Sequence, residues 1–446
     1  MKMWIPMSMM LLASATLYGQ AVPTAEASPG SGPSLSWIDG TVHYSLSASQ
    51  LIQDGLYGAS NVTTATNLSG NAGYASMSKD LPFSMIYAGG ILFGYGDSQG
   101  TTTYQNIEVS QGLIRGKWIL NISDSFSFLP QSPTTGYSGI SGVGDLGTTP
   151  ISGPSGGPAG GVLTYSANRI SNSLVGSVER RLTGATSVSG SSTWSVLHFL
   201  DANAGLDTTQ ILGEVGINHR IDARNSAGVN AVYSTYLTDG NGLLTQPSNP
   251  SFQTRGLNFT YSRLWTRALS MDASVGPQWI SSSDATVLPA RVNVSASVGV
   301  NYTRKQTSMG VHYFRGVNAG SGVQTGALSD SISASIGRPL SHNWMGSVSG
   351  SFAHTSQLLY LPPVTGGITP SSANESYKTF FGGAQLTRAL GRSWSCFASY
   401  NAQNQSINNA SGAQNALAAQ NAFSGFSQTI GIGITFAPRS TRLGEF

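Results

Sequence analysis

The sequence predicts an all-β protein, a transmembrane antiparallel up-and-down β-barrel of about 18 strands, with about 16 as the fallback count. Three observations predict it: long segments of alternating apolar and polar residues, a repeat of short basic turns, and a low content of charge. Only 9% of the 446 residues are charged, whereas soluble domains average about 25%. The polarity comes from Ser, Thr, Asn, Gln and Gly instead, and a soluble β-sandwich would carry more surface charge.

The N-terminal segment predicts secretion. Residues 1–27 begin with Lys2 and an apolar stretch that is shorter than the roughly 20 residues of a membrane-spanning helix, as in a signal peptide. Small residues offer cleavage sites after Ala21 or Ala27. No later apolar run has spanning length, so a membrane protein of this sequence must be a closed barrel. We expect a periplasmic N-terminal segment at 28–40, the barrel at 41–436 and a C-terminal tail at 437–446.

Alternation is clearest at residues 291–303. One face carries Val292, Val294, Ala296, Val298, Val300 and Tyr302, and the other carries Arg291, Asn293, Ser295, Ser297, Gly299, Asn301 and Thr303. A tilted membrane strand needs about 9 to 11 residues, whereas soluble strands have about 5 or 6. The length of this segment therefore favours a membrane barrel.

A short basic turn recurs about every 40 residues, the length of one hairpin and its loop. The turns lie at 78–80, 115–117, 180–182, 219–224, 263–267, 304–305, 338–342 and 388–392, and they hold most of the 22 basic residues. Acidic residues lie in the longer loops between them. Short turns predict the periplasmic rim, and long loops predict the extracellular rim. Eight hairpins plus a first and a last strand give the count of about 18.

Aromatic residues follow the same repeat. Trp118, Trp265, Trp344 and Trp394 lie in or just after basic turns, so we expect them to form the periplasmic girdle. Candidates for the outer girdle are Tyr87, Phe126, Phe128, Trp194, Tyr236, Trp279, Phe314, Phe352 and Tyr400.

Charged residues within strands are candidates for the lumen. From their strand phase we place five cations in or near it: Arg169, Arg255, Arg291, Arg315 and Lys378. The strand acids that could also line it are Glu108, Asp124, Glu179, Glu214 and Asp272. The Gly, Pro and Ser-rich loop at 130–161 is either a surface loop or a segment that folds into the lumen and narrows it.

The signal segment, the hairpin repeat and a last strand that ends at Phe436 resemble bacterial outer-membrane β-barrels. The resemblance implies a Gram-negative outer membrane, contact with its lipid and lipopolysaccharide, and an assembly machinery that reads Phe436. The tail beyond it leaves Phe446 as an alternative signal. More narrowly, residues 123–130 and the Arg-x-Leu turns resemble uncharacterised acidobacterial barrels and, loosely, barrels associated with exopolysaccharide systems.

No motif predicts an enzyme, a cofactor or a metal site, because the six histidines are scattered and Cys396 is the single cysteine. The net charge of +3 is too small to predict nucleic acid as a partner. Barrels of about 16 to 18 strands leave an aqueous channel. The sequence therefore predicts a porin-like channel of low charge selectivity for small neutral solutes such as saccharides. The alternative is a non-conducting accessory barrel for exopolysaccharide export or surface attachment.

Overall fold

The computed structural model describes most of the predicted barrel. It covers residues 40–55, 62–76, 78–95, 101–131, 167–200, 207–239, 251–282, 288–318, 326–358, 376–408, 424–439 and 441–443. The predicted signal peptide and nearly all of the 28–40 segment lie outside the described residues. So does the 130–161 loop, apart from its first two residues, which end a strand.

The described chain is all strand and turn. The wall consists of β1 (Gly40–Asp54), β2 (Thr63–Ser76), β3 (Phe83–Tyr95), β4 (Thr101–Arg115), β5 (Trp118–Gln131), β6 (Ala167–Arg181), β7 (Thr186–Phe199), β8 (Asp207–Arg220), β9 (Asn225–Asp239), β10 (Ser251–Leu264), β11 (Leu269–Ser282), β12 (Arg291–Arg304), β13 (Thr307–Asn318), β14 (Ala327–Pro339), β15 (Trp344–Gln357), β16 (Ser376–Ala389), β17 (Trp394–Asn408) and β18 (Gly425–Phe436). A short β19 (Thr441–Leu443) follows.

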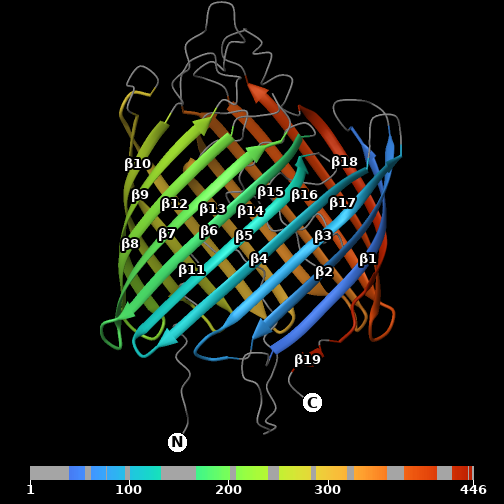
Figure 1. The fold of residues 1–446 in the computed structure, drawn as a ribbon, viewed down its shortest axis with the longest axis horizontal. Helices are drawn as coiled ribbons and strands as arrows, with labels where there is room; N and C mark the ends of the chain where they lie inside the picture. The colour runs from blue at the N-terminus through green and yellow to red at the C-terminus, as the bar shows by residue number, and fades with distance from the viewer. Residues whose placement is uncertain are drawn as a thin grey trace, which may run out of the picture.

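Each strand pairs antiparallel with its neighbours in sequence, and β1 pairs with both β2 and β18. The sheet is therefore closed, as Figure 1 shows in the tilted ring of strands. The predicted antiparallel barrel of 18 strands is confirmed. In the part of the chain that the structure describes, no helix is long and apolar enough to cross a membrane.

All eight short connections lie where the basic repeat predicts them. Five of these turns contain the same type of hydrogen bond, in which the N–H of the first turn residue donates to the carbonyl four residues later. It joins Leu182 to Thr186, Ile221 to Asn225, Trp265 to Leu269, Leu340 to Trp344 and Leu390 to Trp394, at 2.8 to 3.0 Å. Because these five turns are short and internally bonded, they fix the register of their hairpins.

In three of these turns the side chain of the second turn residue also accepts two backbone hydrogen bonds. The hydroxyls of Thr183 and Thr266 each accept the N–H groups two and three residues later, and the carboxylate of Asp222 does the same for Arg224 and Asn225. Bonds from the Asn225 side chain and the Arg224 N–H hold the pKa of the Asp222 carboxyl below its usual range. The turn at 221–224 is thus closed by the ionised carboxylate of Asp222, whereas the turns that contain Thr183 and Thr266 are closed by a hydroxyl.

We expect Asp222→Thr to remove a pH dependence without opening the turn. A carboxyl with a lowered folded-state pKa stabilises the fold above its unfolded pKa of about 3.9, and that contribution disappears as the pH falls through the folded value. The denaturation midpoint of the wild-type barrel should therefore fall more than that of the threonine variant between about pH 6 and pH 3. Parallel pH profiles for the two proteins would contradict this role.

Candidate functional site

The two faces of the wall differ in chemistry. Exposed large apolar side chains share one strand phase around the barrel, as in the neighbours Phe259 and Val275 on β10 and β11 and in Val292 and Val294 on β12. The opposite phase carries mainly Ser, Thr, Asn and Gly. Only the outer face of a membrane barrel meets lipid, so the apolar face is the outside and the polar face lines the lumen.

The four tryptophans expected in the periplasmic girdle lie at the short-turn end and are exposed. Three of them carry an arginine over the ring: Arg180 on Trp118, Arg263 on Trp265 and Arg388 on Trp344, with 5.0 to 5.3 Å from guanidinium carbon to ring centroid. Trp394 instead packs against Phe436, with the ring centroids 4.9 Å apart. Amphipathic rings and cations at one level suit a membrane interface.

Only some of the residues expected in the outer girdle lie on the outer face. The register places seven of the nine candidates on the outer face: Tyr87, Phe126, Phe128, Trp194, Trp279, Phe352 and Tyr400. Tyr236 and Phe314 belong to the lumen phase of β9 and β13. A closed wall with an apolar outer band and interfacial aromatics is the outer-membrane type of barrel.

Acidic side chains lie on the lumen face at mid-height. Glu108 and Glu214 stand near the middle of β4 and β8, and Glu214 accepts a 2.7 Å hydrogen bond from the Asn230 amide. Asp272 lies nearer the short turns and faces Gly299, where a Cβ would come within 2.6 Å of the Asp272 carboxylate. His312 lies on the other side of Gly299, so the missing side chain leaves room between the acid and the imidazole.

Only two of the five cations expected in the lumen lie there. Arg169 and Arg291 have the lumen phase at the long-loop ends of β6 and β12. Arg255, Arg315 and Lys378 are on the outer face, because each shares the phase of exposed apolar residues on its own strand. They lie near the long-loop ends, where the lipid face gives way to headgroups and a long cationic side chain reaches water. For these three residues the sequence-based placement was wrong.

One of the strand acids also faces outward. Asp124 shares its phase with Trp118, Leu120 and Ile122 on β5, and its carboxylate accepts a 3.0 Å hydrogen bond from the Asn172 amide on β6. The bond satisfies part of a group that is costly to place against lipid. The remaining acids, Glu179 among them, have the lumen phase.

Neither protein-family models nor curated proteins match this sequence. Solved structures are similar in fold. OpdK of Pseudomonas aeruginosa, solved with vanillate, aligns with a TM-score of 0.43 at 9% identity, over 90% of this chain and 99% of its own. OpdQ of the same organism aligns at 0.40 and 10%, over 91% and 99%. The FrpB iron transporter of Neisseria meningitidis, in its apoprotein form, aligns at 0.46 and 7%, over 89% and 81%.

An apolar cluster fills part of the lumen at the long-loop end. Tyr236, Phe252 and Ile280 come from the lumen face of β9, β10 and β11, and they pack with Leu288, Val317 and Leu358. Tyr236 and Phe252 stack with ring centroids 4.5 Å apart. Wall residues facing an open lumen would stay solvated, whereas Phe252 and Ile280 are each 1% exposed. The described chain thus narrows this mouth.

The cluster forms because the end of β13 leaves the wall. Pairing between β12 and β13 stops at Ala296 and Arg315, although β12 begins at Arg291 and β13 runs on to Asn318. Beyond that point β13 pairs only with β14, and the Tyr236 hydroxyl donates to the Val317 carbonyl at 3.2 Å. Since β9 and β13 are not neighbours in the ring, the end of β13 lies inside the barrel. No pattern in the sequence marks this contact.

Arg169 is the most deeply buried cation of the described lumen face, at 2% exposure. Its Nε and Nη1 atoms are buried without a hydrogen-bond partner, and Phe199 of β7 lies opposite it. Arg291, by contrast, is exposed at the same end. No three His, Cys, Asp or Glu side chains come together as a metal site within the described ranges.

Proposed function

We propose that this protein is an outer-membrane channel for small neutral polar solutes, saccharides among them, with a modest preference for cations over anions. The observation that carries the proposal is the closed ring of 18 strands with a polar lumen wall. Rings of this size enclose an aqueous channel. Hydroxyl and amide side chains exchange hydrogen bonds with sugar hydroxyls or water at little cost.

The ion preference comes from the level at which the lumen charges lie. The acids Glu108 and Glu214 lie at the middle of the wall, and Asp272 lies toward the short turns. The cations Arg169 and Arg291 lie at the long-loop mouth. A charged wall raises the local concentration of counter-ions inside a channel. We therefore expect potassium to pass more readily than chloride.

The test is reversal potential in a planar bilayer with a potassium chloride gradient. The wild-type channel should conduct and favour potassium, and the double variant Glu108→Gln/Glu214→Gln should bring the permeability ratio close to about 1. Asp124→Asn is the matched control, because this acid faces lipid and should leave the ratio unchanged. Anion preference in the wild type would contradict the charge argument.

Solute passage is measured separately, by swelling of liposomes in sugars of increasing size. Entry of small sugars supports the channel. A bilayer that stays sealed, together with no swelling, would contradict the channel and favour the accessory barrel. The observation that supports this alternative is the narrowed mouth around Phe252. That alternative predicts that deleting the gene lowers exopolysaccharide export or surface attachment.

A further inference from the structure

A lateral row of polar side chains crosses the outer face of four neighbouring strands near the long-loop end. Arg315 of β13 lies opposite Asp330 of β14, Asp330 opposite His354 of β15, and His354 opposite Lys378 of β16. The next residues toward the short turns on three of these strands are Ile332, Phe352 and Phe380, which are exposed at 40 to 49%. The row therefore lies along the edge of the lipid-facing apolar band that is nearest the long loops.

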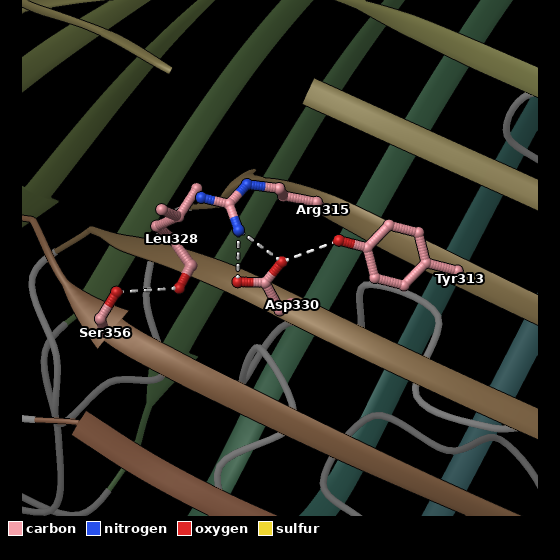
Figure 2. A network of polar contacts seen from close by, with 5 residues as sticks. All are labelled: Tyr313, Arg315, Leu328, Asp330 and Ser356. Atoms are coloured by element: carbon pink, nitrogen blue, oxygen red, sulfur yellow. Dashed lines mark hydrogen bonds and ion pairs between the residues drawn. The ribbon is translucent and has the colours of Figure 1, made fainter. Parts of the chain in front are cut away.

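Asp330, the acid in this row, already has hydrogen-bond partners within the row's own strands. Both oxygens of Asp330 lie 2.9 Å from Nη1 of Arg315, and the Tyr313 hydroxyl donates to the same carboxylate at 3.0 Å. Figure 2 shows the Arg315 guanidinium and the Tyr313 hydroxyl both directed at the Asp330 carboxylate. Both bonds of the ion pair come from Nη1, one of the three nitrogens of the Arg315 guanidinium, which carries five N–H donors in all.

The row carries more cations than anions. Lys378 is exposed, and its ammonium makes no ion pair with any described residue. The Nδ1 atom of His354 is buried and lacks a hydrogen-bond partner. Cations at the edge of a lipid-facing band meet headgroups, and arginine and lysine bind phosphate oxygens strongly.

We propose that this row is a binding site for a phosphate-bearing lipid of the outer leaflet. Its phosphate would be held by Arg315 and Lys378, with His354 between them, and its acyl chains would lie on Ile332, Phe352 and Phe380. The resemblance to outer-membrane barrels implies contact with lipopolysaccharide in general, and the proposal assigns residues to that contact. A second copy of this chain fits less well, because a twofold contact would set the cations of one row against those of the other.

The probe is lipid A, a diphosphorylated acyl-glucosamine, added to the intact barrel in detergent and counted by native mass spectrometry. We expect wild-type protein to retain it and His354→Gln/Lys378→Gln to bind it at least about tenfold more weakly. Arg315 is left in place, because removing it would leave Asp330 uncompensated. Arg255→Gln is the matched control: it removes an outward cation that lies between Tyr233 and Trp279, away from the row.

Four outcomes would overturn the proposal. They are unchanged lipid A binding in the double variant, equal loss in the Arg255 control, displacement of lipid A by millimolar inorganic phosphate alone, and a dimer that dissociates in the double variant. Heat-modifiable migration on a denaturing gel verifies that each variant is a folded barrel. Conductance should be the same in both variants, so failure of the lipid site and failure of the channel are separate results.

Discussion

Val275→Arg will destabilise the barrel by about 2 to 4 kcal/mol, the cost of a cation on the lipid face near the bilayer midplane. Val275 lies on the outer face of β11, between the exposed rings of Trp265 and Trp279, and is 52% exposed. Its lateral neighbours Phe259 and Ala296 offer no acid to compensate the charge. The measurement is the free energy of unfolding in lipid vesicles, from denaturant titration.

The control is the adjacent residue. Ser274 has the lumen phase and pairs with Thr260 and Ser297, so an arginine there points into water among small polar side chains. We expect Ser274→Arg to change the unfolding free energy by less than about 1 kcal/mol. Equal losses for the two variants would mean that the assignment of the two faces is wrong.

Phe252→Ala will cost about 3 to 5 kcal/mol, because it removes a ring that is fully packed inside the mouth cluster. The ring stacks on Tyr236 and belongs to the cluster that holds the end of β13 inside the barrel. Loosening that end should also widen the mouth, so single-channel conductance should rise. Both readouts are needed, since a cavity alone would lower stability without changing conductance.

Phe259→Ala supplies the matched comparison on the same strand. This ring faces lipid and is 56% exposed, so its loss leaves no packed cavity. We expect a smaller loss of stability and an unchanged conductance. A larger effect at Phe259 than at Phe252 would contradict the packed mouth.

Local patterns were sufficient to predict the architecture. Strand length, the period of two and the basic turns depend on neighbouring residues only, so the sequence places the eight hairpins and the two faces of β12 correctly. The count of strands followed from the same repeat. The four tryptophans were placed at the short-turn end because each lies in or just after a basic turn.

The error at the lumen came from assigning the wrong strand phase to Arg255, Arg315 and Lys378. Arg255 alternates in step with Leu257 and Phe259, and Lys378 with Phe380, so the apolar phase alone would have placed both outside. Charge is informative mainly within the hydrocarbon layer, although Asp124 at the middle of β5 faces outward even there. Beyond this layer both faces of a strand meet water or headgroups, and the cost that normally excludes a cation from the outer face is absent.

The mouth cluster could not be found from sequence at all. It joins β9, β10 and β11 to the end of β13 and to Leu358, segments that are far apart along the chain. Tyr236 was assigned to the outer girdle because its position near a strand end is all that the sequence shows. A departure of one strand from the ring leaves the alternation of that strand unchanged.

The last two strands close the ring with a shift of register. β18 pairs with β1 up to Leu46 and Phe436, and β19 then pairs with Gly40, Thr41 and Val42 after an offset of one residue. The expected tail thus extends the wall below Phe436. Whether Phe436 is the residue read during assembly stays a prediction.

This closure has a consequence for the time course of folding. Every hairpin forms from segments that are adjacent in the chain, but a bond such as that between Gln428 and Asp54, 374 residues apart, needs the whole polypeptide. Pairing of β1 with β18 therefore completes the ring only after the last strand has been made. Until then β1 and the growing end expose two rows of unpaired N–H and C=O groups, which are templates for aggregation. The incomplete barrel must therefore be shielded from lipid and from its own copies until the final strand arrives.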